Sequence, residues 1–132
     1  MSTTLSQNNV ESIASTLVEK CRQFKFEEVI KEFYASDIVS IESMDMPEYP
    51  KEIQGLQAVI EKGQRWANNT EVHQMKVSEP LVAGSQFVVR FEMDVTCKQT
   101  NERNTMQELA LYHVENGKIV REQFFYDVCQ QS

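Results

Sequence analysis

Hydrophobic residues in the first third of the chain recur at helical spacing. From Val10 to Phe24 an apolar side chain returns every three or four positions, with polar residues between them. A second, shorter apolar repeat spans residues 26–33, and Ala35-Ser36-Asp37 ends it. The pattern therefore predicts a long amphipathic helix followed closely by a short one.

The pattern then changes to a strand, a loop and a third helix. Residues 38–42 alternate with period two, which puts Ile38, Ser40 and Glu42 on one face of a short strand. Residues 43–54 hold two of the three prolines and show no periodicity, so we predict a loop there. After Gly55, apolar positions return at helical spacing and predict a third helix over residues 56–67.

The second half of the chain has the period of strands. The clearest alternation lies in residues 85–98, where one face carries only apolar side chains: Phe87, Val89, Phe91, Met93 and Val95. Further strands are predicted over residues 71–82, with a break or bulge near Pro80, and over 105–114 and 118–128, joined by an Asn-Gly turn. Helices followed by antiparallel strands predict one α+β domain over residues 1–132, with a curved sheet wrapped over three helices.

Charge and composition narrow the classes of partner. The chain of 132 residues is 41% hydrophobic, and its 20 acidic residues against 13 Lys and Arg give a net charge of −7. It has no basic cluster, which argues against nucleic acid and anionic membranes as partners. The first residues lack the basic start and apolar run of a secretory signal, and no stretch has the length of a membrane span. We expect a cytoplasmic protein.

Metal and nucleotide cofactors have no support in the sequence. Cys21, Cys97 and Cys129 share no short spacing, and neither His73 nor His113 stands at a metal-ligand spacing from another ligand residue. The chain also lacks a glycine-rich phosphate loop and a nucleophile elbow. We therefore predict no metal and no cofactor.

Three strings, in this order and at this spacing, resemble the nuclear-transport-factor-2-like superfamily, in particular its SnoaL-like and ketosteroid-isomerase-like branches. They are "FYASDIVSIES" at the end of the second helix, "IQGLQAVIEKGQRW" at the start of the third, and "VENGKIVREQFFYDV" around the last turn. The resemblance covers roughly residues 10–128. It implies a cystatin-like cone, made of a strongly bent sheet and three helices, with a mostly apolar pocket at its wide end.

The resemblance also implies which residues form the site. Glu42 stands where ketosteroid isomerases keep the carboxylate base, so it would lie in the pocket and act as general base. Burial among apolar side chains would raise its pKa, and its replacement by Gln would then stabilise the fold near pH 8. The residues expected to bind substrate are Ile38, Ser40, Trp66, His73, Phe87, Val89, Phe91, Met93, Gln107, Leu109, Glu122, Phe124 and Tyr126.

One departure from the isomerases affects the expected chemistry. Their oxyanion hole uses a tyrosine on the first helix and a protonated aspartic acid on a later strand. The matching positions here carry Val18 and Leu109. Each lost donor typically costs about 10²-fold to 10³-fold in rate, which argues against steroid isomerisation.

Several residues keep an alternative interpretation when they are taken without the family. A glutamate at a strand end, such as Glu42, usually faces solvent, and His73 could be an ordinary surface histidine. Gln107 and Glu122 could lie in the pocket or on the surface, and either Glu42 or Glu122 could be the functional carboxylate. Trp66 could pack in the core rather than line the pocket.

Three functional hypotheses follow. The first is a pocket protein that binds a small apolar molecule with a carbonyl group or ring and catalyses proton transfer. The second has the same pocket but is a carrier or sensor without chemistry, and the third is a protein-interaction module.

We also expect a homodimer through the outer face of the sheet, because that face is too apolar for open solvent. The residues assigned to it are Val88, Arg90, Glu92, Ala110, Tyr112, Ile119, Arg121, Gln123 and Phe125.

Overall fold

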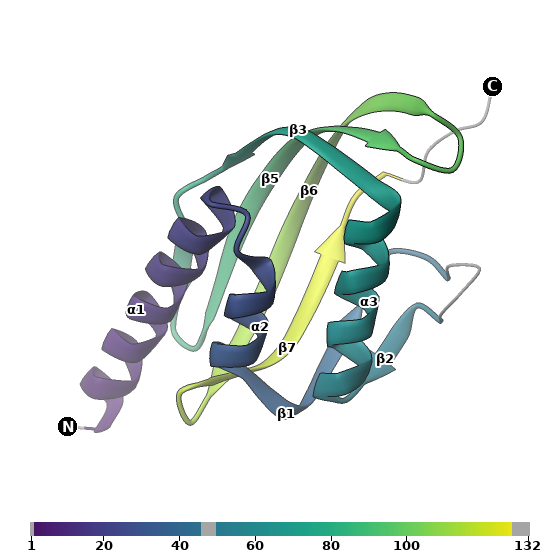
Figure 1. The fold of residues 1–132 in the computed structure, drawn as a ribbon. Helices are drawn as coiled ribbons and strands as arrows, with labels where there is room; N and C mark the ends of the chain where they lie inside the picture. Colours follow the sequence, from purple (N-terminus) through teal and green to yellow (C-terminus); the bar gives the residue numbers. More distant parts are fainter. Residues whose placement is uncertain (1, 46–49, 128–132) are drawn as a thin grey trace.

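The structure is a computed structural model that describes residues 2–45 and 50–127. Three helices and a curved sheet in these ranges confirm the α+β prediction (Figure 1). The helices are α1 (Ser2–Arg22), α2 (Phe26–Phe33) and α3 (Leu56–Asn69). The strands are β1 (Tyr34–Ile41), β2 (Glu52–Gln54), β3 (Thr70–Val77), β4 (Leu81–Ala83), β5 (Gln86–Cys97), β6 (Glu102–Glu115) and β7 (Lys118–Phe125). Strand β2 was not predicted, and part of the predicted loop, residues 46–49, lies outside the described residues.

The sheet has the order β2-β1-β7-β6-β5-β3, with β4 paired to β5. Strand β1 pairs with β7 in parallel, and the other pairs are antiparallel. The sheet is therefore mixed rather than wholly antiparallel. The parallel pair follows from the chain path, because α3 and five strands separate β1 from its neighbour β7.

All three helices pack against one face of the sheet, with α2 between α1 and α3 (Figure 1). The core lies between these layers, and its fully buried side chains include Leu17, Ile38, Val59, Phe87 and Ile119. Burying each such side chain contributes about 1.5–3 kcal/mol, so the apolar stripes of the helices account for their docking on the sheet. The guanidinium of Arg22 adds a polar link, donating hydrogen bonds of 3.2 and 2.8 Å to the Val77 carbonyl oxygen.

The predicted Asn-Gly turn joins β6 to β7. Asn116 has φ 51° and Gly117 has φ 76°, the left-handed conformations that a two-residue hairpin requires. This turn confirms the predicted hairpin and sets the pairing of Glu115 with Lys118.

A β-bulge beyond this turn changes which side chains of the hairpin face the helices. Val114 pairs with Ile119, but His113 pairs with Arg121, so Val120 is an extra residue in β7. A one-residue shift moves every later side chain of one strand to the opposite face relative to its partner. The inward positions of β7 therefore step from Ile119 to Glu122 instead of following strict alternation.

This shift makes the predicted faces of β6 wrong. Without the bulge, Leu109 would lie opposite Phe124, which faces inward; in the structure its partner is Phe125. Leu109 is exposed, and Gln107, two residues before it on the same face, is exposed too. Conversely, three residues assigned to the outer face are buried in the core: Ala110, Tyr112 and Ile119. The other six assignments to the outer face agree with the structure.

The structure also bears on two further expectations, which concern membrane spans and the cysteines. Within the described residues, no helix is long and apolar enough to cross a membrane. Cys21 and Cys97 are free thiols, and Cys129 lies outside the described residues.

The predicted homodimer remains a prediction, and the structure identifies where to test it. Two apolar pairs stand directly opposite each other on adjacent strands of the outer face: Val88 with Leu111, and Leu109 with Phe125. Leu109 and Phe125 are each 45% exposed. We expect Phe125→Glu to convert a dimer into a monomer, because a carboxylate would be desolvated in the contact. Multi-angle light scattering at micromolar concentration measures the mass, and Gln57→Glu on the exposed side of α3 is the matched control. A wild-type protein with a monomer mass would contradict the prediction.

Candidate functional site

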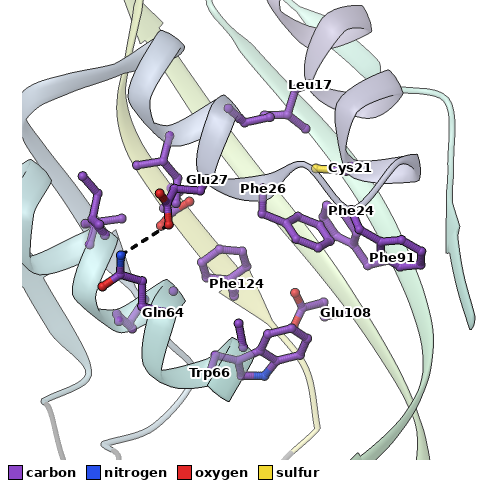
Figure 2. Close-up of a pocket in the computed structure, with 18 of the residues that line it drawn as sticks. Leu17, Cys21, Phe24, Phe26, Glu27, Gln64, Trp66, Phe91, Glu108 and Phe124 are labelled. Atoms are coloured by element: carbon purple, nitrogen blue, oxygen red, sulfur yellow. Dashed lines mark hydrogen bonds between the residues drawn. The ribbon is translucent and has the colours of Figure 1, made fainter. Parts of the chain in front are cut away.

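A cavity of about 700 Å³ lies between the inner face of the sheet and the three helices. Its size is that of pockets for drug-sized molecules, about 300–1,000 Å³. Most of its wall is apolar. The aromatic side chains that line it include Phe24, Phe26, Trp66, Phe91, Phe124 and Tyr126. A hydrogen bond of 3.3 Å from Gln64 to Glu27 links α3 with α2 at the cavity wall (Figure 2).

The predicted site residues fall into three groups. Those that line the cavity are Glu42, Trp66, Phe91, Met93, Glu122, Phe124 and Tyr126. Those buried in the adjoining core are Ile38, Ser40, Phe87 and Val89. Outside the cavity lie Gln107, Leu109 and His73, and the His73 ring is hydrogen-bonded to Thr96 at 2.7 Å. For His73 this placement agrees with the alternative of a surface histidine.

Glu42 lies in the cavity wall immediately after β1, as expected, but it has a cationic partner. Its Oε2 is 2.6 Å from Nζ of Lys62, and its Oε1 accepts a hydrogen bond of 2.8 Å from the Tyr126 hydroxyl. Both side chains of the ion pair are largely buried, with 13% of Glu42 and 10% of Lys62 exposed. The expected unpaired carboxylate is therefore replaced by a buried ion pair.

The Lys62 ammonium also connects this pair to a second carboxyl group. Its Nζ donates a 2.7 Å hydrogen bond to Oγ of Ser40, which donates one of 2.7 Å to Oε2 of Glu122. The Tyr34 hydroxyl donates to Oε1 of Glu122. A continuous chain of hydrogen bonds thus runs along the cavity floor, from Tyr126 through Glu42 and Lys62 to the core.

Glu122 is the most buried ionisable group in this series of hydrogen bonds, with 3% of its surface exposed. Burial raises its pKa, and the negative charge of Glu42 acts in the same direction. The positive charge of Lys62 and the hydrogen bonds from Tyr34 and Ser40 oppose that rise. With both carboxyl oxygens occupied by neighbouring hydroxyl groups, Glu122 is held in one position.

Glu108 is the carboxyl group that differs from the other two. It projects from β6 into the space bordered by Trp66, Phe26 and Phe124 (Figure 2). Among the described residues it has no hydrogen-bond or ion-pair partner. Burial raises its pKa to about 7, and the charges of Glu42 and Glu122 add to that rise, while Lys62 lowers it. This carboxyl group can therefore both accept and release a proton near neutral pH.

Glu108 and Lys62 are among the polar residues of the cavity that were not predicted from the sequence. Glu108 stands directly opposite Phe91 in a regular stretch of the β5–β6 ladder, and directly opposed residues share a face of the sheet. The resemblance had instead put the neighbouring residue, Leu109, in the cavity. Lys62 follows Val59 by three positions and precedes Trp66 by four, so it lies on the inward stripe of α3. That spacing is a signal which the sequence alone could have supplied.

No metal site is evident in residues 2–45 and 50–127. These ranges hold no group of three or more His, Cys, Asp or Glu side chains arranged to bind an ion. The polar atoms of the cavity are instead connected to one another, and Glu108 is available to a bound molecule.

The raised pKa of Glu108 predicts a stability effect that depends on pH. Between its ordinary value of 4.5 and about 7, the folded state keeps a proton that the unfolded chain releases, so the free energy of unfolding falls as pH rises through this window. Glu108→Gln removes that loss, and we expect it to stabilise the fold by up to about 3 kcal/mol at pH 8 and by little at pH 4. Urea denaturation at both pH values measures it, with Glu11→Gln, an exposed position on α1, as control. An equal change in the free energy of unfolding at the two pH values would contradict the raised pKa of Glu108.

For Glu42 the ion pair reverses the expectation from the sequence. Glu42→Gln would leave the buried Lys62 ammonium without its carboxylate, and removing one partner of a buried pair destabilises a fold by about 3 kcal/mol or more. We therefore expect this variant to lose stability at pH 8, where Glu108→Gln gains it. The same denaturation series compares the two, and a stabilised Glu42→Gln protein would show that the ion pair does not hold in solution.

Comparison with known proteins agrees with this geometry. A crystal structure from Mesorhizobium loti, provisionally named a SnoaL-like polyketide cyclase, is 42% identical, with a TM-score of 0.82 over 87% of this chain and 97% of that one. A nuclear-transport-factor-2-like protein of unknown function from Burkholderia pseudomallei is 18% identical, with a TM-score of 0.72 over 90% and 91% of the two chains. A protein with a ketosteroid-isomerase-like fold from Catenulispora acidiphila is 12% identical, with a TM-score of 0.69 over 88% and 85%.

The last two similarities concern the fold alone. A comparison with curated proteins found no match. The sequence profile of the SnoaL-like domain matches residues 8–126, which include every element except the first turns of α1. The chain therefore belongs to the SnoaL-like domain family, as the three strings in its sequence suggested.

Proposed function

We propose that the cavity binds a small apolar carbonyl compound and that Glu108 exchanges a proton with the carbon atom beside the carbonyl group. One observation carries this proposal: Glu108 lies among aromatic side chains and has no hydrogen-bond or ion-pair partner in residues 2–45 and 50–127, whereas Glu42 and Glu122 are hydrogen-bonded. A general base needs an oxygen lone pair that can reach the substrate, and Glu108 has one available.

The apolar walls support the substrate class. Trp66, Phe91 and Phe124 offer flat surfaces for a ring system, and such contacts favour uncharged ligands with few polar groups. The relative from Mesorhizobium loti bears the name of a polyketide cyclase, and polyketides are carbonyl compounds, which is in keeping with this class.

Glu42 is the competing candidate for the base, as the sequence first suggested. Both of its oxygens accept strong hydrogen bonds, from Lys62 and Tyr126, and these would have to weaken before Glu42 could take a proton from carbon. In that alternative Glu108, in its protonated form, would donate a hydrogen bond to the substrate oxygen. The two assignments predict opposite pH dependence.

A proton-exchange experiment tests the proposal. β-Tetralone is a bicyclic ketone with activated C–H bonds, and its exchange in D₂O can be followed by mass spectrometry above the uncatalysed background. We expect the wild-type protein to accelerate exchange, and Glu108→Gln to lower the acceleration by about 10²-fold to 10⁴-fold. Glu102→Gln, at an exposed position of the same strand, is the matched control and should keep full activity.

The pH profile of this exchange separates the alternatives. With Glu108 as base, kcat/KM should rise with pH through about 7 and then level off, because the carboxylate is the active form. With Glu42 as base and Glu108 as acid, kcat/KM should fall over the same range. If β-tetralone quenches Trp66 fluorescence but does not exchange, the proposed catalysis is wrong and the cavity belongs to a carrier or sensor.

A further inference from the structure

We propose that Lys62 forms a covalent imine with an aldehyde or ketone bound in the cavity. The geometry points to this residue because its amine lies inside an apolar pocket and beside a carboxylate and a hydroxyl group. The inference rests on the proposed function only in that both place a carbonyl group in the cavity.

The position of the Lys62 amine favours this reaction. Lys62 is carried on the inward stripe of α3, its side chain is 10% exposed, and it lines the cavity. Its Nζ lies 5.4 Å from the centre of the Phe124 ring, on the same wall that an apolar substrate would contact. A carbonyl carbon held against this wall would meet the amine without a competing water shell.

The Glu42 carboxylate beside the amine is a proton acceptor. An ammonium group is not a nucleophile until it loses a proton, and Oε2 of Glu42 is 2.6 Å from Nζ, close enough to take it. The Tyr126 hydroxyl on the other oxygen and the Ser40 hydroxyl on Nζ hold both groups in place. Amine, carboxylate and orienting hydroxyl together form an activated nucleophile with its base.

The step balances without any further reagent. Glu42 takes one proton from the ammonium group, and the amine nitrogen attacks the carbonyl carbon, forming a C–N bond as the C=O π bond opens. The oxygen receives protons from Glu42 and from the nitrogen and leaves as water, while the nitrogen lone pair forms the C=N bond. The three N–H hydrogens end as one on the iminium and two in water, and the charge stays at +1.

An imine removes the need for a hydrogen-bond donor that would stabilise negative charge on the substrate oxygen. Val18 is buried at the position where the resemblance expects a tyrosine donor, so the oxyanion of an enolate would lack that hydrogen bond. An iminium withdraws electrons through a covalent bond instead. Removal of the neighbouring proton by Glu108 then gives a neutral enamine, so that no oxyanion has to be stabilised.

Reductive trapping tests the proposal directly. The wild-type protein is incubated with 2-naphthaldehyde and sodium cyanoborohydride, and the adduct is located by peptide mass spectrometry. We expect preferential labelling of Lys62, with labelling lost in Lys62→Arg and kept in Lys31→Arg, an exposed control on α2. Glu42→Gln should slow the labelling of Lys62 by about 10²-fold, because it removes the proton acceptor.

A competition measurement keeps the test independent of variant folding. 2-Methylnaphthalene has the ring system but no carbonyl group, so it should lower labelling of Lys62 in the wild-type protein and leave exposed lysines unchanged. Labelling spread over exposed lysines, or a Lys62 signal that the competitor does not lower, would overturn the proposal.

The two proposals can fail separately. If Lys62→Arg folds, by circular dichroism, and still exchanges β-tetralone at the wild-type rate, imine formation is wrong for this reaction while the role of Glu108 stands. If Lys62 is trapped but Glu108→Gln exchanges normally, the imine stands and Glu108 is not the base.

Discussion

The ammonium group of Lys62 is the interaction on which the polar floor of the cavity depends. Glu42 directly follows β1 and Glu122 lies on the neighbouring strand β7, and carboxylates in an apolar site are costly unless they are compensated. Lys62 contacts Glu42 directly and reaches Glu122 through Ser40. One cation therefore allows two strands to present carboxyl groups to the same space. It also ties α3 to the sheet by charge, in addition to the apolar contacts of this helix.

The bulge at Val120 is the second constraint, because it decides which residues of the hairpin reach that floor. On one side of the bulge, β6 and β7 pair so that Val114 and Ile119 both face the helices. On the other side the register has shifted, and Tyr112 and Glu122 face them together. Without the extra residue, the inward side chain of Glu122 would be paired with an outward one on β6. A single inserted residue thus brings the polar positions of both strands to the cavity.

The sequence predicted the elements well and the site unevenly, for physical reasons. Local periodicity gives the helices, the β5 face and the Asn-Gly turn, because these depend on neighbours within a few residues. The bulge is different, because strict alternation does not reveal it. The position carried over from the isomerases assigned Leu109 to the cavity, whereas Glu108 lines it. The partner of Glu42 was missed because an ion pair between β1 and α3 joins residues 20 positions apart. Position on a helical stripe could have indicated Lys62, but not its contact.

Stability alone does not explain why Glu108 differs from the hydrogen-bonded carboxyl groups of Glu42 and Glu122. Glu42 and Glu122 are satisfied by Lys62 and by three hydroxyl groups, an arrangement that a folded core can retain for its own sake. Glu108 has inward neighbours on β6 that are apolar, Met106 and Ala110, and an apolar residue would fit its position at lower cost. Its carboxyl group, which has no partner within the described part of the chain, conflicts with the local pattern of the strand, and such conflicts concentrate where a protein has a task besides folding. The cavity therefore has two kinds of acid: one kind that builds the floor, and one that is left for a bound molecule.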